Sequence, residues 1–206
     1  SIDGGVYTVI DFIEGQSLDY YIKQGYRIQQ KQIILWARQL CEALVYLHGL
    51  VPPIIHSDIK PQNIMITPQG NVCLIDFNIS LDGQGSSQIS GMSAGYAPPE
   101  QYLNASPPPQ GNATGASYSF QMAAPLDARS DIYSLGATLY HLLSGRKPEK
   151  STGPVTPITS LGLPYSQALL EVVERMMQPD PNRRYQTAAE LLRVFCDLRK
   201  LDKRYT

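Results

Sequence analysis

The sequence predicts a mainly helical α+β domain. Four segments carry apolar residues at intervals of three and four positions, which is the spacing of the buried face of an α-helix. Two short runs of β-forming residues flank a turn, and another such run stands near the start of the chain. With 206 residues, of which 43% are hydrophobic, the chain can bury one sizeable core. We therefore expect residues 1–206 to form a single domain.

The first predicted elements are one strand and one long helix. Apart from Asp11, residues 6–13 are β-branched or aromatic, and the run ends at the turn-forming pair Glu14-Gly15, which is typical of a strand. Residues 29–50 form an amphipathic helical pattern that Gly49 and Pro52 end. The apolar positions of that helix are Ile33, Trp36, Ala37, Leu40, Cys41, Leu44 and Leu47.

A hairpin and three further helices follow. The apolar runs 63–66 and 72–75 flank the turn 67–70, which predicts the hairpin. Helices are predicted from residue 131 to Gly145, over 166–177 and over 187–198, and the first of these is apolar enough to be largely buried. Residues 102–125 contain turn-forming residues without periodicity, so we expect a long loop there.

The charge balance excludes some partners. The chain has 17 basic and 18 acidic residues and a net charge of −1, which gives no electrostatic case for nucleic acid as the main partner. No run approaches the ~20 apolar residues that a membrane span needs, and the first residues lack the features of a signal peptide. We expect a cytoplasmic protein with no membrane segment within this chain.

Five motifs in order resemble those of protein kinases. Residues 56–63, His-Ser-Asp-Ile-Lys-Pro-Gln-Asn, resemble the catalytic loop H-R-D-x-K-P-x-N, and residues 76–78, Asp-Phe-Asn, resemble D-F-G. Residues 96–100 resemble the A-P-E segment, residues 131–136 the start of the central helix, and residues 180–187 the late arginine motif. The residues in these motifs are most similar to those of bacterial Hanks-type Ser/Thr kinases. The resemblance covers nearly all of the chain and implies the helical C-terminal lobe of a protein-kinase-like fold.

Phosphoryl transfer explains the residue types in these motifs. The reaction needs an aligned acceptor hydroxyl, metal ions on the phosphates and cations on the developing charge. Asp58 is the candidate base, and Lys60 is expected to project toward the γ-phosphate of ATP. Asn63 and Asp76 offer the oxygen ligands that Mg²⁺ prefers. Each residue alone could be a solvated turn residue, but the ordered set of motifs disfavours that interpretation.

The resemblance also implies a nucleotide side for the site. Residues 6–13 resemble the last small-lobe strand and the hinge, with Ile10 as gatekeeper and backbone groups of Asp11 and Ile13 holding adenine. Ser17 is expected to contact the ribose, and the side chain of Met65 is expected to form the floor of the adenine pocket. Ser17 could equally be a helix N-cap, and Met65 could equally be a core residue.

Further contacts are carried over from the family. Asp131 is expected to hold the catalytic loop through backbone hydrogen bonds. Glu100 and Arg184 are expected to form an ion pair, and Ser93 to hydrogen-bond near Asp58 and Lys60.

The histidines are not expected to be catalytic. In the family, the histidine at the position of His56 packs under the D-F-G phenylalanine, which is Phe77 here. The same interpretation treats His48 and His141 as ordinary helix residues.

Several departures from the family pattern leave alternatives open. Ser57 replaces an arginine and Asn78 a glycine, while the glycine-rich loop and the strand lysine of an N-terminal lobe are absent from this sequence. Residues 103–125 are expected to be an insertion.

The resulting hypothesis is a Ser/Thr protein kinase that transfers the γ-phosphoryl group of ATP, with Mg²⁺, to a protein substrate. This chain alone is expected to be inactive without the small lobe. The alternatives are a pseudokinase that binds nucleotide or acts as a scaffold, and a small-molecule phosphotransferase. The second alternative predicts no Pro-Pro-Glu segment and no late arginine, yet both are present.

Overall fold

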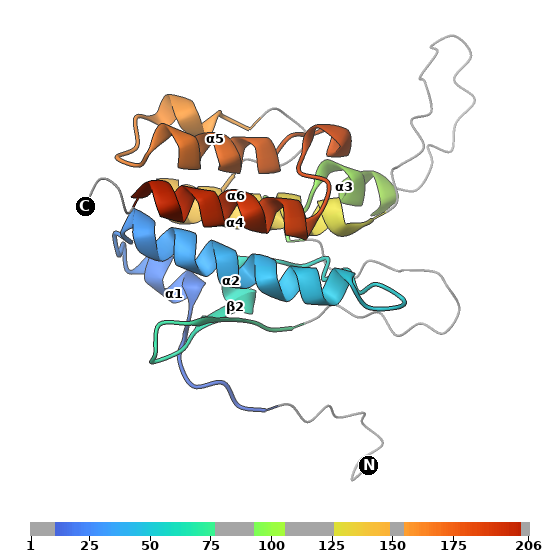
Figure 1. The fold of residues 1–206 in the computed structure, drawn as a ribbon, viewed down its shortest axis with the longest axis horizontal. Coiled ribbons are helices and arrows are strands. Elements are labelled where there is room, and N and C mark those ends of the chain that lie inside the picture. Colours follow the sequence, from blue (N-terminus) through green and yellow to red (C-terminus); the bar gives the residue numbers. More distant parts are fainter. Residues whose placement is uncertain (1–10, 77–92, 106–125, 149–154, 203–206) are drawn as a thin grey trace.

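The helices form layers over one small sheet (Figure 1). In this computed structural model the described residues are 11–76, 93–105, 126–148 and 155–202. Helix α5 (Gln167–Met176) lies above α4 (Ala128–Ser144) and α6 (Ala188–Asp202), and α2 (Gln30–His48) lies below them. The short helix α1 (Leu18–Lys23) and the sheet lie on the far side of α2.

The sheet has three short antiparallel strands in the order β1-β2-β3. They are β1 (Gln16–Ser17), β2 (Ile64–Ile66) and β3 (Val72–Leu74). Strands β2 and β3 are the predicted hairpin, paired from Ile64 with Leu74 to Ile66 with Val72. Gly15 leads into β1 with a φ of 142°, and a Cβ atom there would lie 2.1 Å from the backbone oxygen of Ile66. Only glycine therefore lets β1 approach β2 this closely.

The four predicted long helices are present, and local sequence sets their ends. At the start of α4, Asp127 accepts a hydrogen bond from the N–H of Arg129 and forms a capping box with Ser130. At its end, Gly145 adopts the left-handed conformation with a φ of 67°. Every residue of α4 from Ser130 to Tyr140 is buried, as its apolar composition predicts.

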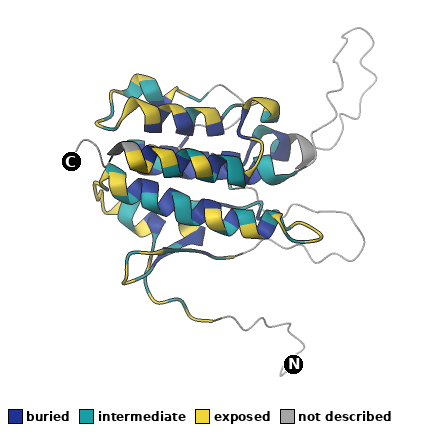
Figure 2. Cartoon of the chain, viewed as in Figure 1, coloured by how far each residue is buried: buried dark blue, intermediate teal, exposed yellow. Residues whose placement is uncertain are grey.

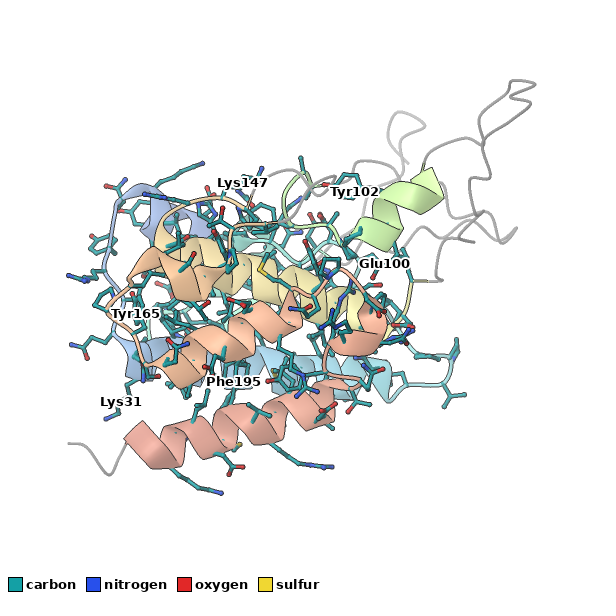
Figure 3. The ribbon with its side chains drawn as sticks, turned by 90° about the horizontal axis from the view of Figure 1, so that it is seen from above. Lys31, Glu100, Tyr102, Lys147, Tyr165 and Phe195 are labelled. Atoms are coloured by element: carbon teal, nitrogen blue, oxygen red, sulfur yellow. The ribbon has the colours of Figure 1, made fainter. Side chains whose placement is uncertain are left out.

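The core fills the spaces between the layers (Figure 2). The buried faces of α2, α4, α5 and α6 meet there, and Phe195 of α6 (Figure 3) is fully buried. Three 3-10 turns complete the described elements, namely Pro61–Asn63, Ile158–Leu161 and Pro181–Arg183. No described helix combines the length and the hydropathy needed to cross a bilayer.

Two predicted boundaries differ from the structure. Residues 11–13 of the predicted strand 6–13 have no strand structure, and residues 6–10 lie outside the described part of the chain. A β-forming sequence becomes a strand only with a hydrogen-bonded neighbour, and β2 pairs with Gln16 and Ser17 instead. Helix α3 (Pro99–Ala105) also continues into the predicted loop 102–125, of which residues 106–125 are not described.

Candidate active site

Asp58 stands at the centre of a polar cluster on the catalytic loop. Its Oδ2 accepts hydrogen bonds from Lys60 Nζ at 2.6 Å and from Asn63 Nδ2 at 3.1 Å. Its Oδ1 accepts one from Ser93 Oγ at 2.7 Å, and Lys60 Nζ also donates to Ser93 Oγ at 2.9 Å. The expected contact of Ser93 with Asp58 and Lys60 is confirmed. The carboxylate of Asp58 is thereby fixed between two segments that are distant in sequence.

A buried carboxylate holds the loop from below. Asp131, in the first turn of α4, is fully buried. Its Oδ2 accepts from the backbone N–H of His56 and its Oδ1 from that of Ser57, both at 2.9 Å, which confirms the expected backbone hydrogen bonds. His48 Nε2 donates to Oδ2 at 2.9 Å. A buried carboxylate is stable only when hydrogen bonds replace its hydration, and Asp131 has three such donors.

His56 has a structural setting. It is fully buried, its Nε2 lies 3.1 Å from the backbone oxygen of Ile75, and its Nδ1 lies 3.3 Å from the backbone nitrogen of Asp58. A carbonyl oxygen only accepts, so Nε2 carries the proton and Nδ1 accepts from the Asp58 N–H. Phe77, its expected packing partner, lies outside the described residues.

The two candidate metal ligands lie close along the hairpin. The backbone N–H of Ile75 donates to the backbone oxygen of Asn63 at 2.9 Å, and Asp76 follows directly with a φ of 61° and an exposed side chain. Asn63 Nδ2 donates to both the backbone oxygen and Oδ2 of Asp58, so its Oδ1 is the side-chain atom that can ligate a metal.

These residues fit a magnesium ion. An amide oxygen and a carboxylate are suitable because Mg²⁺ uses one or two protein ligands together with substrate phosphates. Within the described part of the chain there is no cluster of three or more His, Cys, Asp and Glu residues that would form an all-protein metal cage.

The nucleotide side is only partly formed by the described residues. Ser17 and Met65 are direct partners across strands β1 and β2, so two of the predicted binding residues lie side by side. Ser17 Oγ accepts from the N–H of Tyr20 at 3.3 Å, which makes it the N-cap of α1. Asp11 and Ile13 lie in an irregular segment, and Ile10 is outside the described residues.

A buried ion pair anchors α3. Arg184 donates to Glu100 Oε1 at 2.7 Å through Nη1 and to Oε2 at 2.9 Å through Nη2, and both side chains are almost completely buried. The expected ion pair is therefore confirmed, with the two-point geometry that favours arginine. Ser130 Oγ adds a hydrogen bond to Glu100 at 3.0 Å. In Figure 3, Glu100 lies where α3 meets the start of α4.

Tyr96 joins the segment after Ser93 to the end of α4. Its backbone N–H donates to the carbonyl oxygen of Ser93 at 3.0 Å, and its hydroxyl lies 2.6 Å from His141 Nδ1. Burial lowers the pKa of His141, against the effect of Asp19 and together with that of Lys147. Burial also raises the pKa of Tyr96, with Asp19 acting in the same direction. Both directions favour a neutral imidazole whose Nδ1 accepts a hydrogen bond from the tyrosine hydroxyl.

Comparison with known families identifies the chain. A model described as "Protein kinase domain" matches residues 3–196. The chain belongs to the protein kinase family. A probable serine/threonine-protein kinase of Clostridium acetobutylicum is 32% identical over 207 residues, covering 92% of this chain and 28% of that protein. The serine/threonine-protein kinase PknB of Mycobacterium leprae is 33% identical over 196 residues, covering 90% of this chain and 29% of that protein.

A eukaryotic kinase is also similar. Human serine/threonine-protein kinase tousled-like 2 is 32% identical over 154 residues, covering 68% of this chain and 18% of that protein. This chain spans less than a third of the length of each of these relatives.

Sequence reasoning missed three contacts of this kinase domain. His48 and His141, expected to be ordinary, contact Asp131 and Tyr96 respectively. Gln101 is buried, and its Nε2 donates to the backbone oxygen of Ser57 at 3.2 Å. No local pattern indicates these contacts, because their partners are 83, 45 and 44 positions away.

Proposed function

We propose that the protein containing this kinase domain transfers the γ-phosphoryl group of ATP to a serine or threonine hydroxyl of a protein substrate. The observation that carries the proposal is the cluster of Asp58, Lys60 and Ser93. The similar bacterial proteins, named as serine/threonine kinases, support the same activity. Nucleic acid is not a proposed substrate, in agreement with the net charge of −1.

Asp58 is the proposed catalytic base. A carboxylate oxygen has two lone pairs, and Oδ1 accepts only one hydrogen bond among the described residues, from Ser93. One lone pair therefore remains to orient an acceptor hydroxyl and to receive its proton. Lys60, bonded to Oδ2, is a cation placed to stabilise charge that develops on the transferred group.

Asn63 and Asp76 are the proposed ligands of Mg²⁺. When bound, the metal bridges phosphate oxygens and neutralises their charge. The proposed ATP contacts are the side chains or backbone groups of Ile10, Asp11, Ile13, Ser17 and Met65. The pairing of Ser17 with Met65 supports this assignment, because it aligns Ser17 of β1 with a residue of β2, the strand that follows the catalytic loop. The proposal includes a small lobe that covers ATP from the opposite side.

The test is phosphate transfer by the complete protein. With ATP, Mg²⁺ and a generic protein substrate, the unaltered protein should phosphorylate serine or threonine, and Asp58→Asn should lower the rate about 10²- to 10⁴-fold. The thermal melt of Asp58→Asn should stay close to that of the parent, because Asp58 contributes little to core packing. ATP binding without any transfer by the unaltered protein would indicate a pseudokinase instead.

A further inference from the structure

Ser57, the residue directly before Asp58, has an unusual backbone conformation. Ser57 has a φ of 64°, a left-handed conformation that residues other than glycine seldom adopt. Such a conformation persists only where the surroundings hold it in place. Asp131 Oδ1 holds the N–H of Ser57 at 2.9 Å, and Gln101 Nε2 holds its carbonyl oxygen at 3.2 Å. The second contact fixes the peptide plane that leads into Asp58.

The orientation of the Gln101 amide follows from this contact. A carbonyl oxygen only accepts hydrogen bonds, so the nitrogen of the amide must face Ser57. The other end of the amide, Oε1, is buried and has no hydrogen-bond partner among the described residues. An unsatisfied buried acceptor costs free energy, which an apolar side chain of the same size would avoid. Core filling alone therefore does not explain a glutamine at this position. A need for a hydrogen-bond donor to the Ser57 carbonyl does explain it.

The backbone that carries Gln101 is itself firmly held. Its neighbour Glu100 is bonded to Arg184 and to Ser130, and Gln101 is 2% exposed. Helix α3 thus presents the amide from a fixed position, in the region marked by Glu100 in Figure 3. The contact with Ser57 connects this anchored helix to the catalytic loop.

We propose that Gln101 is a positioning residue that orients Asp58 through the carbonyl group of Ser57. The inference rests on the proposed function, in which Asp58 is the base. A misplaced base lowers the rate of transfer more than it weakens ATP binding, since small displacements of reacting groups are costly. The loss should therefore appear in kcat and not in the KM for ATP.

The first test compares Gln101→Met with the unaltered protein. Methionine keeps the length of the side chain and removes the donor. We expect kcat to fall roughly 10- to 100-fold and a KM for ATP within about twofold. The melting temperature should stay close to that of the parent, because removing the unpaired Oε1 offsets the loss of the hydrogen bond to the Ser57 carbonyl. Gln186→Met is the matched control, because Gln186 Nε2 donates to the backbone oxygen of Arg184 at 2.8 Å, away from Asp58. That variant should keep its kcat.

The second test is the pH profile of Gln101→Glu. A protonated carboxyl can donate to Ser57, and an ionised one cannot. We expect burial and the carboxylates of Asp131 and Asp58 to raise the pKa of the introduced group. The nearby basic side chains do not oppose this effect, because each already has an acidic partner. Arg184 is paired with Glu100, Lys60 with Asp58 and His48 with Asp131. The kcat of this variant relative to the parent should therefore rise as the pH falls.

The outcomes separate this inference from the proposed function. A parent-like kcat in Gln101→Met, or a flat relative pH profile in Gln101→Glu, overturns the positioning role while Asp58-dependent transfer stands. A loss of kcat that only parallels a lowered melting temperature also overturns it. No transfer by the unaltered protein overturns both proposals.

Discussion

The catalytic loop and the segment that leads into α1 adjoin the same small sheet. Polar contacts from several distant segments hold the loop, whereas the segment before α1 is largely irregular. The loop is fixed by Asp131 from below, by Ser93 at its carboxylate and by Gln101 at Ser57. Residues 11–14 have no secondary structure, and Phe12 is 92% exposed. Among the described residues of this segment, Gln16 and Ser17 of strand β1 are the ones that pair with the sheet.

The difference separates the two halves of the proposed chemistry. Transfer depends on positioned charges, and the described residues position Asp58 and Lys60 through buried or half-buried polar contacts. The nucleotide side depends on Ser17 and Met65, which are half-buried, and on backbone groups near Ile13, where residues 11–14 have no secondary structure. Breaking the buried anchor between Glu100 and Arg184 should therefore cost more stability than changes on the nucleotide side.

The largest expected effect is on the anchor of α3. Arg184→Met removes the partner of a buried carboxylate, so the free energy of unfolding should fall by about 3–5 kcal/mol in denaturant titration. Arg175→Met is the matched control, because Arg175 forms an exposed pair with Glu190 at 3.4 Å and should cost at most about 1 kcal/mol. Equal losses in the two variants would contradict the assigned importance of the buried pair.

A smaller effect is expected at the N-cap of α1. Ser17→Ala removes the acceptor for the Tyr20 N–H and should cost about 1 kcal/mol of stability. Ser166→Ala is a matched control, because Ser166 caps α5 with the same 3.3 Å geometry at Leu169. If Ser17 contacts ribose, its variant should also raise the KM for ATP, whereas the control should not. Equal KM values in both variants would assign Ser17 to capping alone.

The smallest effect concerns pH. Burial lowers the pKa of His141 in the folded state, and Lys147 acts in the same direction against Asp19. The unfolded chain therefore binds more protons at this position, so folding stability decreases as the pH falls through about 6.5, the ordinary histidine value. Above that pH the histidine is neutral in both the folded and the unfolded state, so its effect on the pH dependence of stability disappears. His141→Gln should show a shallower loss of stability between about pH 7 and pH 5 than the parent, and identical slopes would contradict this prediction.

Local patterns in the sequence were enough to predict the helices and the hairpin. Apolar periodicity is local, so the long helices and the 67–70 turn could be predicted within a few residues of their observed ends. The motifs also predicted that Asp131 would meet the catalytic loop and that Glu100 would meet Arg184, because those pairs follow from the family resemblance.

The long-range polar contacts around the candidate site come from the packing of the helices. Gln101 meets Ser57, His48 meets Asp131 and His141 meets Tyr96 because the packing of α2, α3 and α4 brings them together. The strand expected over residues 6–13 shows the same limit, since Phe12 and Ile13 have β-forming side chains but no strand pairing. Local side-chain preferences specify which element a segment favours, whereas hydrogen-bond partners depend on segments distant in the chain.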